Sequence, residues 1–341
     1  MKILHVANFN MGKYGNTYYN TDRKLTNGLI RNGHFVYEFS YRDVARYESF
    51  FRTTKLNGER KANRFLLKTV SQFQPDLLLL GHSELITVET LERIREMVPG
   101  IKIALWYVDP LFHEQAIQHV INRLECFDAV FATTGGEWLA KFKGSRNVAA
   151  FFPNPVDPSV ECHQSFNLAH AAVDLLFCGR EAKGSEREYM LKELKGKLSG
   201  IYFEIWGSLN RPKIFGHAYY QKLAETKMGL NLSRRTDIPL YSSDRIAQLT
   251  GNGILTFTGK IPCFETLFTK EEVVYFENMD ELADQINYFH RNDSHRRQIA
   301  AKGWQKAHAS FNVERIARYM LEVIFNKPFS EPYEWRYERI L

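Results

Sequence analysis

Short runs of apolar residues alternate along the chain with longer segments in which apolar positions recur every three or four residues. The run at residues 76–80 is continuously aliphatic, as in parallel strands that are covered on both faces. Apolar runs that alternate with helical patterns predict a doubly wound, parallel α/β sheet. The predicted strands of the first half of the chain span residues 2–8, 34–41, 76–80, 102–108, 128–133 and 149–152.

The segment 153–158 holds three prolines in six residues and predicts a domain boundary. After it the alternation restarts, which predicts a second sheet followed by three closing helices. We therefore predict an α/β protein of two Rossmann-like domains facing a cleft. The predicted bounds are 1–155 for the N-terminal domain, 156–172 for a linker, 173–315 for the C-terminal domain, and 316–341 for a helix and tail that cross back to the N-terminal domain.

Two candidate catalytic residues follow predicted strands of the first domain, because sheets of this kind bind ligands beyond the carboxyl ends of their strands. Asp109 follows the strand 102–108, and Pro110 keeps it out of helical geometry. Asp109 is a candidate general base or acceptor anchor. Alternatively, it caps a helix that begins near Leu111. His82 follows the strand 76–80, although a lone histidine is more often a structural residue.

The stretch 241–259 predicts a short helix, a tight glycine turn and a buried strand. Gly251 and Gly253 allow another molecule to approach the backbone closely. Arg245 is the one permanent cation of the predicted helix, and a guanidinium group can hold a phosphate with two parallel N–H bonds. The alternative interpretation places Arg245 on a solvated face of an ordinary helix–strand connection.

Other strand ends of the second domain supply further candidates for binding a nucleotide. Arg234 and Arg235 follow the predicted strand 228–232, and one of them is explained equally well as a surface charge. Loop serines such as Ser242 are more often turn or capping residues than ligands. The remaining predicted binding residues are Gly179, Arg180, Lys183, Gly207, Ser208 and Ser243.

Composition narrows the classes of function. The net charge of +6 and the pI near 9.0 indicate an anionic partner. The sequence shows no nucleic-acid-binding motif. No run of 18 apolar residues occurs, and the start of the chain predicts a strand instead of a signal peptide. The four cysteines are widely spaced, which predicts reduced thiols in a cytoplasmic protein and no metal site.

Two segments are rich in aromatic residues. Residues 42–64 hold seven Lys/Arg against three acidic residues, with Tyr47, Phe50 and Phe51 interleaved. An amphipathic helix that packs on the sheet explains them, and a surface for anionic lipid or a polyanionic acceptor is the alternative. The aromatic residues of the tail 327–341 predict that it packs on the first domain, with docking on a membrane through Trp335 as the rival.

Several motifs together resemble the GT-B glycosyltransferases, and especially the spore-maturation-protein-like glycosyltransferases of bacteria. The sequence PNPVD at 153–157 resembles the interdomain segment of that fold. Arg245 and Gly253 match the R-x-x-E-x-x-x-x-G element of the family, with Gln248 where a glutamate is usual. The sequences WYVDP at 106–110, EVVYF at 272–276, DEL at 280–282 and IAAKG at 299–303 are similar to other parts of the family pattern.

The resemblance implies a transferase for a nucleotide-activated sugar, with the nucleotide on the C-terminal domain and the acceptor on the N-terminal domain. Gln248 would contact the ribose of the donor, with a carbonyl in place of the usual carboxylate. The implied acceptor is a glycan, a lipid-linked molecule or a protein in surface polysaccharide or glycoconjugate synthesis. No cofactor is implied besides the nucleotide-sugar donor. The expected location is cytoplasmic, with peripheral contact at the inner face of the membrane as an option.

Other functions remain open at this point. A non-catalytic sugar-nucleotide or glycan-binding protein of the same fold is the main alternative, because Gln248 departs from the family pattern. An epimerase or a phosphorylase is a further option within the fold. A nucleic-acid binder is disfavoured because the positive charge is spread over the whole chain. The residues do not decide between inversion and retention of the anomeric centre.

Overall fold

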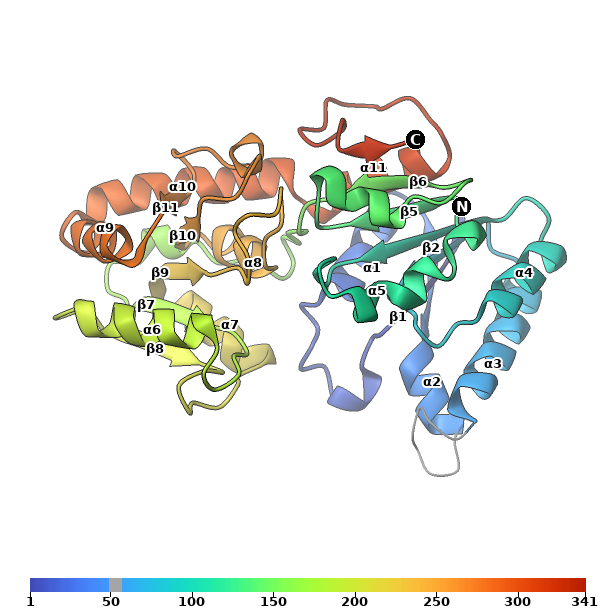
Figure 1. The fold of residues 1–341 in the computed structure, drawn as a ribbon, viewed down its shortest axis with the longest axis horizontal. Coiled ribbons are helices and arrows are strands. Elements are labelled where there is room, and N and C mark those ends of the chain that lie inside the picture. Colours follow the sequence, from blue (N-terminus) through green and yellow to red (C-terminus); the bar gives the residue numbers. More distant parts are fainter. Residues whose placement is uncertain (49–56) are drawn as a thin grey trace. The chain divides into compact units, whose positions relative to one another are not determined.

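The computed structural model describes residues 1–48 and 57–341. The chain forms two compact units (Figure 1). Unit 1 consists of Met1–Pro153 and Val313–Leu341, and unit 2 of Asn154–Asn312. The segment 156–172, for which we predicted a linker, therefore belongs to unit 2 and includes the short 3₁₀ helix η4 (Ser165–Asn167). Each unit is an α/β sheet with helices, as predicted.

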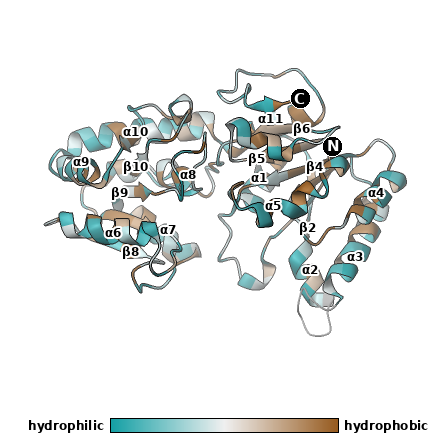
Figure 2. Ribbon diagram, viewed as in Figure 1, coloured by the Kyte–Doolittle hydropathy of each residue, from teal (hydrophilic) through white to brown (hydrophobic). Residues whose placement is uncertain are grey.

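Unit 1 contains a seven-stranded sheet in the order β12-β6-β5-β4-β3-β1-β2. Strands β1 to β6 run parallel, and the short β12 pairs antiparallel with β6 at one edge. The apolar residues gather on central strands such as β4 (brown in Figure 2), where Ile103, Ala104 and Leu105 are fully buried. The strands are β1 (Lys2–Ala7), β2 (Phe35–Ser40), β3 (Leu77–Gly81), β4 (Lys102–Tyr107), β5 (Ala129–Ala132), β6 (Val148–Phe151) and β12 (Arg339–Ile340).

The segment 42–64, for which we predicted an amphipathic helix, contains most of α2 and the start of α3, and residues 49–56 lie outside the described residues. The apolar pattern of residues 112–124 predicts one helix, but α5 begins only after the turn at 111–112, and a 3₁₀ helix stands at the end of the segment. Phe50 and Phe51 lie outside the described residues. The helices are α1 (Thr21–Arg31), α2 (Tyr41–Glu48), α3 (Gly58–Phe73), α4 (Val88–Met97), α5 (Glu114–Ile121) and α11 (Val313–Ile324), with the 3₁₀ helices η1 (Met11–Lys13), η2 (Leu124–Cys126) and η3 (Gly136–Phe142).

Unit 2 contains a five-stranded parallel sheet in the order β11-β10-β9-β7-β8. Its core is apolar, with Leu175, Phe177 and Leu255 fully buried. The strands are β7 (Val173–Cys178), β8 (Phe203–Trp206), β9 (Thr226–Asn231), β10 (Leu255–Gly259) and β11 (Val274–Phe276). The helices are α6 (Glu186–Lys197), α7 (Gly216–Ala224), α8 (Arg245–Gly251), α9 (Met279–Arg291) and α10 (Asp293–Ser310), with the 3₁₀ helix η5 (Phe264–Thr266).

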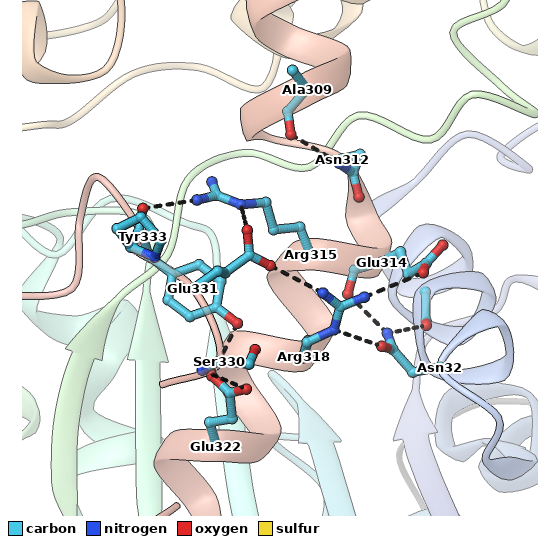
Figure 3. Close-up of polar contacts among 12 residues, drawn as sticks. Asn32, Ala309, Asn312, Glu314, Arg315, Arg318, Glu322, Ser330, Glu331 and Tyr333 are labelled. Atoms are coloured by element: carbon cyan, nitrogen blue, oxygen red, sulfur yellow. Dashed lines mark hydrogen bonds and ion pairs between the residues drawn. The ribbon is translucent and has the colours of Figure 1, made fainter. Parts of the chain in front are cut away.

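The C-terminal tail packs on α11 within unit 1. The guanidinium group of Arg315 lies over the rings of Tyr333 and Trp335, at 4.9 and 5.2 Å from their centroids, and its Nε donates to Glu331 at 2.6 Å. Arg318 links Glu331 to Asn32, the C-cap residue of α1 (Figure 3). Tyr333 and Trp335 are each 1% exposed. The rival hypothesis, in which Trp335 docks on a membrane, is therefore wrong, because its ring lies in the core of unit 1.

Candidate functional site

Arg245 lies at the carboxyl edge of the sheet in unit 2. It is the first residue of α8, and its side chain is directed at the ends of β7 and β9. Nη2 donates to the carbonyl oxygen of Leu232 at 2.7 Å, and Nη1 lies 3.4 Å from the carbonyl oxygen of Cys178. The guanidinium carbon lies 5.2 Å from the centroid of the Phe177 ring. Arg245 is only 9% exposed, so its alternative interpretation as a solvated surface residue is wrong.

Arg187 brings a second guanidinium group to the same edge. It lies in the first turn of α6, and Nη1 donates to the Leu232 carbonyl oxygen at 2.6 Å. Its Nη2 pairs with Glu181. Burial and the neighbouring charges of Arg245 and Arg234 lower the pKa of Arg187, while Glu181 raises it. Sequence reasoning missed Arg187, although a helix that starts shortly after a strand end directs its first turn at the edge of the sheet.

A pocket of about 440 Å³, within the size range of small-molecule sites, is lined by Arg187 but not by Arg245. Three of its lining residues are arginines, and the start of α6, capped by the Ser185 hydroxyl, forms part of its wall. Helix N-termini and guanidinium groups both favour anions. The pocket is lined by Arg180, Glu181, Ala182, Ser185, Glu186, Arg187 and Arg234.

Buried polar atoms without a partner also gather at this edge. A buried polar atom normally forms a hydrogen bond, and leaving one unpaired costs about 1–3 kcal/mol. Within the described part of the chain, five such atoms belong to residues at or just after the strand ends and the two arginines. They are Arg187 Nε, Arg245 Nε, Ser208 Oγ, Asn231 Oδ1 and Ser233 Oγ. The edge is therefore equipped to form hydrogen bonds with a bound polar molecule.

Two glycines let the backbone segments of this edge approach one another. A Cβ atom on Gly207, which has a φ of +80°, would lie 2.6 Å from the carbonyl oxygen of Gly179. A Cβ atom on Gly179 would lie 2.9 Å from Nη1 of Arg245. Gly251 and Gly253 lie elsewhere, because Cβ atoms there would meet Glu161 and Phe166. Packing against the segment 154–167 explains this second pair.

Gln248 is held inside unit 2 by both ends of its amide. Its Oε1 accepts from the hydroxyl of Tyr219 at 2.7 Å, and its Nε2 donates to Asp244 Oδ2 at 3.0 Å. Ser243 Oγ donates to the other carboxylate oxygen of Asp244 at 3.2 Å. A glutamate at position 248 would place its charge against Asp244, so the glutamine suits this environment. Lys183 is exposed on the loop before α6 and does not line the pocket.

The structure brings the two catalytic candidates of unit 1 together. His82 follows β3 and Asp109 follows β4, and these strands are neighbours in the sheet. His82 Nδ1 lies 3.6 Å from Asp109 Oδ2, and the carboxylate is 65% exposed. Burial lowers the pKa of His82, although the nearby carboxylates of Asp109 and Glu84 act in the opposite direction. The imidazole is therefore neutral near pH 7 and able to accept a proton.

Asp109 does not cap a helix. The next helix, α5, begins at Glu114, and His113 occupies its N-cap position. No helix begins near Leu111, where residues 111–112 form a turn. The capping alternative is therefore wrong, because a turn separates Pro110 from the start of α5.

Arg123 fixes the backbone at His82. His82 and Ser83 have φ values of 54° and 51°, a conformation that is unfavourable for residues other than glycine. The buried Arg123 donates to the carbonyl oxygens of His82, Ser83 and Ile86 at 2.8–3.0 Å. Its guanidinium group thereby holds the left-handed turn that directs the imidazole. The sequence shows no signal for this role, because Arg123 is 40 residues further along the chain.

Asp22 of α1 brings another carboxyl group to the end of β1, the strand next to β3. Asp22 Oδ1 accepts from the backbone N–H of Asn8 at 2.9 Å, and burial raises the pKa of its carboxyl to about 6. Sequence reasoning missed Asp22. Within the residues that the structure describes, no group of three or more His, Cys, Asp or Glu side chains is arranged to hold a metal ion.

Comparison with known sequences finds one family model that is similar to part of the chain. Residues 180–322 match the model of the glycosyl transferase-like family. The match begins at the first arginine of the pocket and includes Arg187, Arg234 and Arg245. No curated protein matches the chain by sequence.

Solved structures show the same fold along the whole chain. A sucrose-phosphate synthase from Thermosynechococcus elongatus has a TM-score of 0.63 at 12% identity, with 96% of this chain and 98% of that chain covered. Anabaena HepE, in complex with UDP-glucose, has a TM-score of 0.57 at 15% identity, with 96% and 100% covered. The avilamycin A biosynthesis glycosyltransferase AviGT4 has a TM-score of 0.58 at 12% identity, with 95% and 97% covered. The chain therefore has the two-sheet α/β fold of the GT-B type.

Proposed function

We propose that this protein is a glycosyltransferase that moves a sugar from a nucleotide-sugar donor to an acceptor. The observation that carries the proposal is the set of arginines at the carboxyl edge of unit 2, inside the segment that matches the glycosyl transferase-like family. The UDP-glucose complex of a structure with the same fold supports a donor of this class. The proposed acceptor is a glycan, a lipid-linked molecule or a protein in surface polysaccharide or glycoconjugate synthesis, and the proposed location is the cytoplasm.

In this proposal the bond between the sugar and the diphosphate breaks as the acceptor hydroxyl group bonds to the anomeric carbon, and the arginines neutralise the nucleoside diphosphate that leaves. Charge-assisted hydrogen bonds of this kind are stronger in the transition state, where negative charge develops on the departing phosphate. The close approach of Gly207 to Gly179 supports backbone contacts to the same ligand in this proposal. Transfer then needs neither a metal ion nor another cofactor. The proposed donor contacts are Gly179, Arg180, Lys183, Arg187, Gly207, Ser208, Arg234, Ser243 and Arg245. Gln248 holds Asp244 through the hydrogen bond from its Nε2.

His82 and Asp109 are proposed to serve the acceptor. A neutral imidazole accepts the proton of the attacking hydroxyl group, and the Asp109 carboxylate stabilises the imidazolium ion that forms. Arg123 acts as a positioning residue, because it donates to the backbone carbonyls of His82 and Ser83 and to the Ser83 hydroxyl. This arrangement suits a reaction that requires a general base.

Release of the nucleotide tests the proposal: a nucleoside diphosphate from UDP-, GDP- and dTDP-linked sugars, and the monophosphate from CMP-linked sugars. Incubation of each donor with the protein, with and without a mixture of candidate acceptors, should give acceptor-dependent release of one nucleotide. EDTA should leave that rate unchanged, because the arginines supply the positive charge. Absence of nucleotide release with every donor would contradict the enzymatic role.

A non-catalytic sugar-nucleotide or glycan-binding protein is the second candidate. The observation that favours it is Gln248, whose amide is committed to Tyr219 and Asp244 and carries no charge. A binding protein would show nucleotide affinity without turnover. Calorimetric binding of a donor that is recovered intact after prolonged incubation would favour this candidate over the transferase.

A further inference from the structure

One face of α3 carries only positive charge. The buried residues of α3, such as Ala62, Leu66 and Val70, line the side that faces the protein. Arg60, Arg64 and Lys68 are exposed and succeed one another at intervals of four residues, so they form a row along the opposite side. Phe65, which is 37% exposed, flanks this row. We call Arg60, Arg64 and Lys68 the basic row of α3.

The charges of the basic row are not balanced within the protein. In residues 1–48 and 57–341, none of the three side chains forms an ion pair or a hydrogen bond. The one acidic residue of α3, Glu59, lies about 100° around the helix axis from Arg60. Like charges four residues apart destabilise a helix by a few tenths of a kcal/mol for each pair. A typical solvated helix face mixes both signs of charge, and this face does not.

The shape of the row identifies the kind of partner. The row extends over two turns, about 12 Å along one exposed side of the helix. A line of exposed cations suits a planar array of anionic headgroups better than a small anion, which requires convergent donors. An exposed aromatic ring beside basic residues is typical of helices that lie at the headgroup level of a bilayer. The same packed pair of helices also exposes Tyr47 of α2, which is 75% exposed.

We propose that the basic row of α3 docks unit 1 on the surface of an anionic phospholipid bilayer. The interaction is peripheral and reversible. Each Lys or Arg near such a surface strengthens binding about fivefold, so that three give about a hundredfold. Because the charges are exposed, salt should release the protein. The docking surface does not involve the pocket of unit 2 or the His82–Asp109 pair, and it holds whether or not the proposed transferase activity does.

Sedimentation with vesicles tests this surface. The full chain is mixed with vesicles of equal parts phosphatidylglycerol and phosphatidylcholine, and with vesicles of phosphatidylcholine alone. The test variant is Arg60→Gln, Arg64→Gln and Lys68→Gln. The matched control, Lys195→Gln, Lys270→Gln and Arg291→Gln, removes the same charge from three exposed residues of unit 2. Circular dichroism verifies that both variants are folded.

The wild type and the control should sediment with the anionic vesicles only, and 0.5 M NaCl should release them. The partition of the test variant onto the anionic vesicles should be about a hundredfold weaker than that of the wild type. Phe65→Ser should weaken this partition more than substitution of any single control residue. Equal partitioning of the two triple variants would overturn the proposal, as would a wild type that fails to sediment. Binding to heparin but not to vesicles, lost in the test variant alone, would also overturn it, because the partner would then be a soluble polyanion.

Discussion

Arg187 and Arg245 donate to the same acceptor, the carbonyl oxygen of Leu232, at 2.6 and 2.7 Å. Two guanidinium groups are thereby held together at the end of β9, although like charges repel and each keeps an unpaired Nε. Only Arg187 has an acidic partner, Glu181. A dianionic ligand at this edge would relieve the repulsion and satisfy the unpaired atoms. This relationship is the physical basis for placing the donor phosphates in unit 2.

Replacement of Arg245 by alanine should lower kcat/KM for the donor by about 10–100-fold, the loss of one charge-assisted contact of about 1.5–3 kcal/mol. Part of the loss has a structural origin, because Arg245 also binds two backbone carbonyls. Arg245→Lys keeps a charge but not the fork of donors, and it should recover only part of the activity. Steady-state kinetics, with thermal denaturation as a check on folding, measures both effects. An alanine variant with wild-type kcat/KM would remove Arg245 from the site.

Replacement of His82 by glutamine should reduce turnover by about 100-fold or more if the imidazole is the general base. Since burial lowers the pKa of His82, the neutral form predominates at pH 7 and activity should fall on the acidic side of pH 6.5. Asp109 raises that pKa, so Asp109→Asn should move the acidic limb of the pH–rate profile to lower pH. Profiles of kcat/KM from pH 5 to 8 measure the shift. An acidic limb that is unchanged in Asp109→Asn would contradict the pairing.

The sequence predicts most of the fold because its strands are marked by apolar runs and its breaks by Gly and Pro. The apolar patterns of residues 88–97 and 279–291 predict helices with the same bounds as α4 and α9. The pairing of β12 with β6 could not be predicted, because two residues carry no strand pattern. The late start of α5 could not be predicted either, because the turn at 111–112 contains apolar residues, as the first turn of a helix does.

The candidate site was predictable where a residue directly follows a strand, and less so where a helix delivers it. Asp109, His82 and Arg180 each follow a strand end, so topology alone predicts that they lie at the carboxyl edge of a sheet, where folds of this kind bind ligands. Arg187 and Arg123 act from within or just after helices, and both donate to backbone carbonyls, which leave no trace in the sequence. Gly251 and Gly253 carried a misleading signal, because close packing against a protein segment and close approach of a ligand require the same residue.

Replacement of Trp335 by alanine should lower the free energy of unfolding by about 3–5 kcal/mol, the usual cost of removing a large buried ring. The ring is 1% exposed, and Arg315 lies over it. Tyr337, two residues further on, is 79% exposed, so Tyr337→Ala is a matched control with little expected effect. Urea denaturation measures both variants. Equal stability of the two would mean that the tail is not packed on α11.

The stability of the protein should decrease as the pH falls below neutral, in part because of His5. Burial lowers the pKa of His5 to about 3, while the unfolded chain binds a proton near pH 6.5. Between these values the unfolded state holds more protons, so acid favours unfolding. His5 alone should reduce the free energy of unfolding by about 2 kcal/mol between pH 7 and pH 5. His5→Gln should lose this component, and urea denaturation at both pH values should show a correspondingly smaller difference between them.

Calorimetric titration of UDP, GDP, CDP and dTDP into the wild type, Arg234→Ala and Arg235→Ala tests the donor site most directly. The two arginines are adjacent and exposed, but only Arg234 lines the pocket, whereas Arg235 pairs with Asp237. One diphosphate should bind the wild type, and its Kd should rise by about 10-fold or more in Arg234→Ala while remaining unchanged in Arg235→Ala. Equal effects of the two substitutions, or no binding of any nucleoside diphosphate, would contradict the assignment of the pocket to the donor.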